Sequence, residues 1–242
     1  MKKTILILGA SRGIGKAVSK YLLEKGYRIV AVARTEALLQ ELVAGQEENA
    51  KYIVCDLSDM SNIAAIFDNL NEWGIILSGA VYCAGICTSE PIKIIDMDTM
   101  QRDLMINTLS FVEMGKYFSK KKYLSDGASI VAISSMSAWD MTKGMCTYSM
   151  SKAALNTAVQ TMSKEFVKRK VRVNAVLPAY VNTSMTVGSD QVDSKIAMLQ
   201  EKQPLGIIEP EYIAYMVEFL LSEKAQYMTG ALIPISGGRT EK

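Results

Sequence analysis

The chain has 242 residues, of which 49% are hydrophobic and 21% charged, and its formal net charge at pH 7 is +2. This length suits one large α/β domain with a substantial core, while the near-neutral charge gives no electrostatic basis for binding nucleic acid. Because the chain contains no histidine, a Ser-His-Asp triad and a histidine-ligated metal site are excluded, and we expect no bound metal.

Expected strands and helices alternate along the chain. Apolar runs predict strands at residues 4–8, 28–33, 52–55, 75–83, 128–134, 171–177 and 231–235. Helices are expected from the glycine-rich segment 9–15 to about residue 25, from about residue 36, and over residues 59–73, 99–121, 147–168 and 211–221. Continuous apolar strands are typical of a parallel sheet with both faces covered. The pattern therefore predicts a single doubly wound Rossmann-type α/β domain over residues 1–242, with a seven-stranded parallel sheet and helices on both faces.

One long irregular stretch, residues 180–210, follows the sixth expected strand and contains a possible helix at residues 192–203. Open α/β sheets bind their ligands at the carboxyl ends of the strands. We therefore expect residues 182–210 to form a lid over a substrate at that edge.

A glycine-rich loop, Gly9-Ala10-Ser11-Arg12-Gly13-Ile14-Gly15, comes directly after the first expected strand. Gly9 permits a tight turn, while Gly13 and Gly15 let backbone amides approach a pyrophosphate at the helix N-terminus. The alternative is an ordinary strand-to-helix turn, which would not need three glycines. The expected cofactor contacts from this loop are Gly9, Ser11, Arg12, Gly13, Ile14 and Gly15.

The end of the second strand indicates which cofactor is bound. A site for NAD commonly carries an acid there, which holds the ribose 2′-hydroxyl. This chain has Ala33-Arg34 instead, and Arg12 lies inside the glycine loop. Two guanidinium groups can pair with a 2′-phosphate in bidentate fashion, so we expect NADP(H). The alternative is that both arginines are simply solvated.

Tyr148 and Lys152 are four residues apart, so on a helix they lie one turn apart on the same face. An apolar stripe at helical spacing continues from them along residues 155–166. A phenol titrates near ~10 and exchanges protons poorly at neutral pH, whereas a neighbouring ammonium favours the phenolate and lowers its pKa. The pair is therefore interpreted as a proton relay, with Lys152 expected to lower the pKa of Tyr148.

Two further residues complete a recognisable pattern: Ser135, thirteen residues before Tyr148, and Asn107 between the glycine loop and that serine. With the glycine loop and the Tyr-x-x-x-Lys pair, the chain resembles the classical, NADP-preferring short-chain dehydrogenase/reductase family over nearly its whole length. The resemblance implies that Ser135 holds the substrate oxygen while Tyr148 supplies the proton. It also implies that Lys152 holds the nicotinamide ribose and that Asn107 supports a water linking Lys152 to solvent. The implied catalytic residues are Asn107, Ser135, Tyr148 and Lys152.

The resemblance extends to further cofactor contacts. Asp56 matches an adenine-contacting acid, with helix capping as the alternative. The remaining cofactor-binding matches are Ala84, Gly85, Tyr148, Lys152, Pro178, Val181 and Thr183. The chain departs from the family at Leu8, where a Thr is usual, and at Tyr82-Cys83, where Asn-Asn is usual. Because losing two paired polar groups together can be nearly neutral, we interpret these changes as one co-adapted apolar substitution. Ala179 and Ser236 are smaller departures, at positions that usually carry Gly and Asp.

These features predict an NADPH-dependent carbonyl reductase that takes a small-molecule carbonyl or alcohol substrate. One alternative is a 3-oxoacyl-(acyl carrier protein) reductase, whose carrier could dock on the basic clusters 120–122 and 168–170; those clusters can equally be cations favoured at helix C-termini. An alternative from another class is a catalytically silent NADP-binding regulator. Family resemblance also implies a homotetramer or homodimer that pairs the helices at residues 99–121 and 147–168.

The substrate itself is not readable from the sequence, although apolar side chains gather in two candidate segments. They suit an adaptable pocket or ordinary core packing: Met136, Trp139, Met141, Met145, Met185, Met198 and Leu199. We expect a cytoplasmic protein without a membrane partner. Met1-Lys2-Lys3 leads directly into a strand rather than into a signal peptide, the four cysteines form no CxxC pair, and no run reaches the roughly eighteen apolar residues of a membrane helix.

Overall fold

In a computed structural model, which describes residues 2–187 and 199–239, the described strands form one seven-stranded sheet. The strands are β1 (Thr4–Leu8), β2 (Arg28–Ala33), β3 (Ala50–Val54), β4 (Leu77–Tyr82), β5 (Leu124–Ile133), β6 (Arg172–Pro178) and β7 (Leu232–Ile235). Their order is β3-β2-β1-β4-β5-β6-β7, and every neighbouring pair is parallel. The predicted doubly wound parallel sheet is confirmed.

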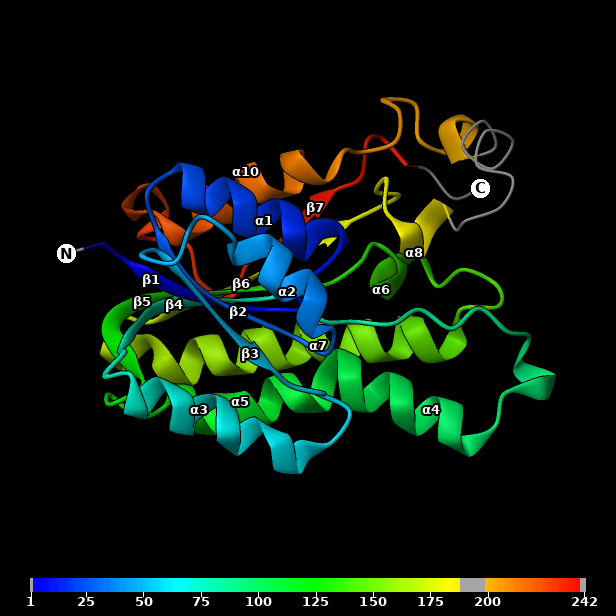
Figure 1. The fold of residues 1–242 in the computed structure, drawn as a ribbon. Coiled ribbons are helices and arrows are strands. Elements are labelled where there is room, and N and C mark those ends of the chain that lie inside the picture. The colour runs from blue at the N-terminus through cyan, green and yellow to red at the C-terminus, as the bar shows by residue number, and fades with distance from the viewer. Residues whose placement is uncertain (1, 188–198, 240–242) are drawn as a thin grey trace.

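Helices cover both faces of this sheet (Figure 1). On one face lie α1 (Gly13–Glu24), α2 (Glu36–Val43) and α10 (Pro210–Leu221). On the other lie α3 (Ile63–Glu72), α4 (Met97–Leu104), α5 (Ser110–Phe118) and α7 (Cys146–Phe166). Two short helices, α6 (Ser137–Asp140) and α8 (Ser184–Val187), follow the carboxyl ends of β5 and β6.

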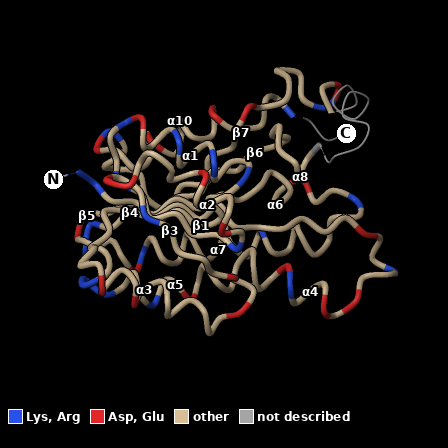
Figure 2. Tube along the Cα trace, in the orientation of Figure 1, with Lys and Arg blue, Asp and Glu red and all other residues tan. Residues whose placement is uncertain are grey.

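The continuous apolar strands explain the layers, because a strand that is apolar on both sides must be covered on both sides. All seven residues of β6 are buried. The stripe predicted for the tyrosine helix, Leu155, Val159, Met162 and Phe166, lies in the apolar cluster between the sheet and α3, α5 and α7. A second cluster fills the space between the sheet and α1, α2 and α10. Figure 2 shows both signs of charge interspersed over the outer helices and loops.

The chain reverses direction across the sheet between β1 and β4. From β1 it proceeds outward through β2 and β3, and then it returns to β4 on the other side of β1. Such a switch point opens a crevice at the carboxyl ends of the two central strands. A Cβ added to Gly9, just after β1, would lie 2.7 Å from the backbone nitrogen of Ala84, just after β4. The two segments therefore meet at this edge.

The helix expected over residues 99–121 is not a continuous α-helix. It consists of α4, a π-helical turn at Met105–Leu109 and α5, which ends at Phe118. A sequence pattern with a 3.6-residue period does not reveal one extra residue in a turn, so the prediction was wrong in this detail. Single π turns inside α-helices are frequent at functional sites, and this one contains the predicted site residue Asn107.

Smaller differences concern element boundaries. A 3-10 turn at Met60–Asn62 precedes α3, and Asp59 rather than Ser58 caps it by accepting from the Ser61 amide at 2.9 Å. The expected helix at 192–203 and Met198 fall largely outside the described residues, although residues 199–202 are helical. The expected lid, residues 182–210, is described only over residues 182–187 and 199–210. Val181, just before it, forms an isolated parallel bridge with Ile208 near its end. No helix in the described ranges is long and apolar enough to cross a membrane.

Candidate active site at the carboxyl edge of the sheet

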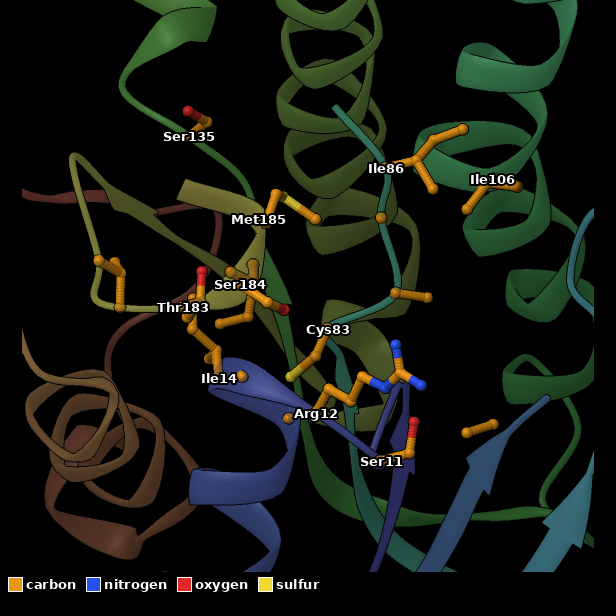
Figure 3. A pocket seen from close by; sticks show the side chains of 18 of the residues that line it. Ser11, Arg12, Ile14, Cys83, Ile86, Ile106, Ser135, Thr183, Ser184 and Met185 are labelled. Carbon is orange, nitrogen blue, oxygen red and sulfur yellow. The ribbon is translucent and has the colours of Figure 1, made fainter. Parts of the chain in front are cut away.

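A cleft of about 310 Å³ opens at the switch point. Figure 3 shows side chains from the glycine loop, from the segment after β4 and from the segment after β6 gathered around it. Every cofactor-binding and catalytic residue predicted from the sequence lines this cleft, with the exception of Asn107. The structure therefore brings together residues that are up to 174 positions apart in the chain, from Gly9 to Thr183.

The glycine loop leaves no room for side chains where the backbone turns. A Cβ on Gly15 would lie 2.0 Å from the carbonyl oxygen of Gly9, and Gly13 has a φ of +49° with Thr183 directly beside it. Helix α1 begins at Gly13, its N-cap residue Arg12 makes no side-chain cap, and its first turn carries no acid. The first amides of a helix lack intrahelical partners and favour an anion. The loop therefore fits the pyrophosphate of a dinucleotide.

The cleft is also lined by Arg12 from the glycine loop, Arg34 after β2 and Asp56 after β3. Nη1 of Arg34 is 3.9 Å from Oδ2 of Asp56, and the two side chains are 64% and 44% exposed. An ion pair this exposed contributes little to stability, so Arg34 is available to a ligand. Asp56 also accepts from the amide and hydroxyl of Ser58 at 2.9 and 2.8 Å. It therefore organises a turn and lines the cleft. Helix capping by Asp56 was wrong, because Asp59 caps the following 3-10 turn, and the adenine contact stays a prediction.

The three central residues of the predicted relay lie together. Tyr148 and Ser135 are nearly buried, with 9% and 8% of their surfaces exposed, and their hydroxyl groups are hydrogen-bonded. Nζ of Lys152 lies 5.9 Å from the centre of the Tyr148 ring and donates to the carbonyl oxygen of Ile133 at 3.0 Å. Ser134, the neighbouring serine, instead donates to the carbonyl oxygen of Lys152 within α7. Of the two serines, Ser135 is therefore the one hydrogen-bonded to Tyr148.

The expected direction of the pKa shift on Tyr148 is wrong for this structure. Burial is the largest cause and raises the pKa of Tyr148 above its ordinary value, while the hydrogen bond with Ser135 acts in the opposite direction. Burial also lowers the pKa of Lys152 from 10.5 to about 8. Desolvation disfavours the charged form of each group. Its effect on both pKa values is larger than that of the attraction between a tyrosinate and the lysine cation.

Asn107 lies behind the cleft wall, fully buried in the π turn. Its Oδ1 accepts from the amide of Ile86 at 2.8 Å, and its Nδ2 donates to the carbonyl oxygen of Ile86 and to Oγ of Ser151, both at 2.9 Å. A Cβ added to Gly85 would lie 3.2 Å from both Oδ1 of Asn107 and Nζ of Lys152. Asn107 and Lys152 therefore flank the same small space, which the glycine keeps open.

Tyr82 changes the interpretation of the departures from the family pattern. Its ring is buried opposite Leu8 in the β1–β4 register, as expected for an apolar replacement. Its hydroxyl, however, is hydrogen-bonded to the carbonyl oxygen of Ile106 and to the hydroxyl of Ser110, on either side of Asn107. The interpretation as a purely apolar substitution was wrong here, because the phenol satisfies a carbonyl in the π turn.

The sequence analysis missed Gln203, which holds the segment after β6. This side chain is fully buried; its Oε1 accepts from the amide of Tyr180 at 2.9 Å and its Nε2 donates to the carbonyl oxygen of the same residue at 3.2 Å. A Cβ on Gly237 would lie 2.6 Å from it, so Gly237 leaves it room. A single glutamine in an irregular stretch carries no sequence signal for this role. Gln203 does not line the cleft itself. Residues that line it and that were not predicted as site residues include Cys83, Ile86, Ile106, Ser184 and Thr186.

The predicted pocket methionines separate into different environments. Met185 lines the cleft, whereas Met136 is buried in the apolar cluster beneath the sheet. Trp139 and Met141 are 46% and 72% exposed. Met141 has a φ of +50°. It borders a second cavity of about 750 Å³ beside α7, and Met150 lines the same cavity. Of the methionines in this set, Met185 alone lines the cleft within the described residues.

Known proteins resemble this chain along almost its full length. A family model described as Enoyl-(Acyl carrier protein) reductase matches residues 9–240. Carbonyl reductase family member 4 of Danio rerio is 31% identical over 240 residues, which cover 98% of each protein. The 3-oxoacyl-(acyl carrier protein) reductase of Aggregatibacter actinomycetemcomitans is 31% identical over 248 residues, covering 98% of this chain and 99% of that protein.

A solved structure shows the same relationship in three dimensions. A short chain dehydrogenase family protein from Francisella tularensis superimposes with a TM-score of 0.86 at 30% identity, over 98% of both chains. A Serratia marcescens short-chain dehydrogenase/reductase variant superimposes with a TM-score of 0.88 at 26% identity. Fold, switch-point cleft and sequence matches thus agree, and the chain belongs to the short-chain dehydrogenase/reductase family of oxidoreductases, which use nicotinamide cofactors on carbonyl and alcohol groups.

Proposed function

We propose that this protein is an NADPH-dependent carbonyl reductase that also catalyses the reverse oxidation of the alcohol. The observation that carries the proposal is the meeting of Ser135, Tyr148 and Lys152 on the wall of the cleft that the glycine loop borders. The fit of that loop to a pyrophosphate supports a dinucleotide in the same cleft. When bound, the nicotinamide would supply the hydride.

Within this proposal the chain's own residues handle the substrate oxygen and its proton. Ser135 would hold the carbonyl oxygen by a hydrogen bond, and Tyr148, kept as a neutral phenol by burial, would donate its proton to that oxygen. Lys152 would hold the nicotinamide ribose and, as a cation, favour the tyrosinate that remains. Asn107 would keep the cleft wall at Ile86 in place and, by family resemblance, support a water that links Lys152 to solvent.

The test is turnover of a panel of ketones with NADPH and NADH, and of the corresponding alcohols with the oxidised cofactors. Reduction of at least one ketone class by the purified protein is the expected result. If the protein binds NADPH tightly and turns over none of the panel, the catalytically silent regulator becomes the better interpretation.

Cofactor preference is the first prediction. Arg12 and Arg34 border the cleft and no acid follows β2, so NADPH is expected to bind more tightly than NADH. Arg34→Asp should narrow or reverse the difference, by about tenfold or more, because a charge-assisted contact is lost and a like charge introduced. Fluorescence titration of both cofactors measures it. Arg28→Asp, at the opposite end of β2, is the matched control and should leave the preference unchanged. Equal affinities in the parent would contradict the assignment.

A second candidate function is the reduction of 3-oxoacyl groups on acyl carrier protein. It is supported by the names of relatives that are 3-oxoacyl-(acyl carrier protein) reductases. The basic clusters at residues 120–122 and 168–170 precede β5 and β6. In a parallel sheet they therefore lie at the edge opposite the cleft, and Lys121 is already paired with Asp126 at 2.7 Å. A carrier docked on those clusters would be remote from Tyr148. Comparing turnover of a 3-oxoacyl thioester, free and carrier-bound, separates the two candidates.

Self-association is a further prediction. Leu109, Val112 and Met150 are 42–43% exposed on the outward sides of the π turn, α5 and α7, and apolar surface of this kind favours an isologous contact. Ala158, also on α7, packs partly against the core. We expect a tetramer or dimer in sedimentation equilibrium, and Val112→Glu should shift it toward monomer. Ile76→Glu, an exposed apolar residue beside β4, should not. A monomeric parent at micromolar concentration would contradict this.

A further inference from the structure

A buried carboxylate without a cationic partner lies between α4 and α7. Asp103 has no exposed surface, and in the described part of the chain no ion pair includes it. Its Oδ1 accepts from the Thr88 hydroxyl at 2.9 Å and its Oδ2 from the Thr147 hydroxyl at 2.7 Å. Two donated hydrogen bonds make a buried charge tolerable, but they do not explain why a charge is kept there.

The position of Asp103 relates it to Asn107. The two residues are one helical turn apart, and so are their partners on α7, Thr147 and Ser151. Two hydrogen-bonded rungs, Asp103 to Thr147 and Asn107 to Ser151, thus join α4 and the π turn to α7. Beside them, Oγ1 of Thr108 donates to the carbonyl oxygen of Ser151 at 2.6 Å. Ser151 in turn donates to the carbonyl oxygen of Tyr148 at 2.7 Å.

Each rung also holds the segment that follows β4. Asn107 is hydrogen-bonded to both backbone groups of Ile86, and Asp103 accepts from the side chain of Thr88. Ile86 lines the cleft opposite the tyrosine helix. The two rungs therefore connect the cleft wall to the first two turns of α7, and the first of these turns carries Tyr148.

We propose that Asp103 is a positioning residue that holds Thr147, and with it the adjacent Tyr148, in register with the cleft wall at residues 85–88. The inference rests on the proposed function, in which Tyr148 donates the proton. It extends that function by a residue outside the cleft. A proton donor misplaced by about 1 Å can cost on the order of 10²-fold in rate, so a rigid anchor one residue away has a direct use.

The charge of Asp103 has a second effect on Tyr148. Burial is the largest cause of the raised pKa of Tyr148, and the charges of Cys87 and Asp103 raise it further, while the Ser135 hydrogen bond lowers it. The titratable groups that bear on Tyr148 are thus Asp103 from α4, Cys87 from the segment after β4, and Lys152 on its own helix. A nearby carboxylate keeps the phenol neutral, which is the form that donates a proton in reduction. Removing that charge should lower the pH at which reduction declines.

The test compares three variants of the full-length protein. Asp103→Asn removes the charge and weakens the rung, Thr147→Val breaks the rung and keeps the charge, and Asp98→Asn is a matched control on an exposed position of the same helix. We expect Asp103→Asn and Thr147→Val to lower kcat about tenfold with little change in NADPH affinity. In Asp103→Asn alone, the alkaline decline of ketone reduction should begin at a lower pH than in the parent. Asp98→Asn should match the parent.

Amide hydrogen exchange supplies a readout that needs no substrate. Exchange at residues 146–151 should accelerate in Asp103→Asn and Thr147→Val relative to the rest of α7, whereas Asp98→Asn should follow the parent. If the parent turned over no ketone, that result would count against the proposed function. Amide exchange at residues 146–151 would still show whether Asp103 holds the first turns of α7 in place. Asp103→Asn with parental kcat, pH profile and exchange would overturn the proposal, as would acceleration spread evenly over the whole domain. Should Asp103→Asn fail to fold, parental kcat and exchange in Thr147→Val would overturn it.

Discussion

Tyr148→Phe is expected to reduce carbonyl turnover by roughly 10²–10⁴-fold, the usual loss when a positioned proton donor is removed. NADPH affinity should stay close to that of the parent, because the aromatic ring and its packing remain while only a hydroxyl is lost. That hydroxyl is nearly buried and hydrogen-bonded to Ser135, so no solvent molecule can replace it at the same position without rearrangement. Steady-state kinetics with any accepted ketone, together with fluorescence titration of NADPH, measures both quantities.

Two further variants make this result specific. Tyr123→Phe removes a hydroxyl from another buried tyrosine, which lies in the apolar cluster between the sheet and α3, α5 and α7. Tyr123 immediately precedes β5, at the edge of the sheet opposite the cleft, so the change should leave turnover unchanged. Ser135→Ala should lower turnover with little change in NADPH affinity, because it removes the hydrogen bond to the substrate oxygen and leaves the glycine loop intact. Near-normal turnover in Tyr148→Phe would refute the proposed mechanism and assign the proton to a different acid.

The architecture was predictable because each strand has its own apolar run in the sequence. Apolar runs of four to nine residues, separated by amphipathic segments, leave few arrangements besides a parallel sheet covered on both faces. The first turn after β1 was predictable for a related reason. Gly9 and Gly15 occur where any Cβ would collide with backbone atoms, so the glycine spacing reflects a steric requirement that can be read from the sequence.

The detail of the long helix was not predictable from periodicity. An extra residue in the turn at Met105–Leu109 leaves the apolar spacing on either side intact. Its supports are also remote in sequence, since Tyr82 reaches the carbonyl oxygen of Ile106 from a different strand. Asp103 illustrates the same limit, because its partners Thr88 and Thr147 lie 15 and 44 residues away. Neither Asp103 nor Thr88 belongs to a motif that would single it out.

The direction of the pKa shift on Tyr148 could not be read from spacing either. A spacing of four residues between a phenol and an ammonium on a helix predicts proximity, and proximity alone predicts attraction between a tyrosinate and a lysine cation. Both groups are nearly buried, with 9% and 4% of their surfaces exposed, so desolvation acts against the charged form of each. The outcome depends on a burial that only the folded chain defines. A relay of this kind therefore starts from a neutral phenol.

Lys152→Met is expected to separate the functional use of this lysine from its cost to stability. Burial lowers the pKa of Lys152 from 10.5 to about 8. The folded protein therefore binds the proton on Lys152 less tightly than the unfolded chain does, and below pH 8 it carries the ammonium at a cost in stability. Between pH 8 and 10.5 the unfolded chain binds more protons, and the free energy of unfolding therefore rises with pH across that window. At pH 7 the penalty is on the order of 3 kcal/mol, partly offset by the hydrogen bond to Ile133, worth about 1 kcal/mol.

Lys152→Met keeps the apolar stem of the side chain and removes the charge. Its thermal midpoint at pH 7 should therefore exceed that of the parent by a few degrees, and the difference should shrink toward pH 10.5. Lys164→Met, an exposed position on the same helix, is the control and should change neither quantity. A Lys152→Met variant that is markedly less stable than the parent at pH 7 would contradict the sign of this argument.

The same substitution should damage function while it stabilises the fold. If the ammonium contacts the nicotinamide ribose, NADPH affinity at pH 7 should fall about 10- to 100-fold in Lys152→Met, as for a lost hydrogen bond to a charged group. Turnover should fall by at least about 10²-fold, because the developing tyrosinate loses its cation. The parent's affinity for NADPH should also decline as the pH rises through about 8, where the ammonium of Lys152 deprotonates. Lys152→Met should show no such decline, and titrations across that pH range therefore test the ribose contact independently of any substrate.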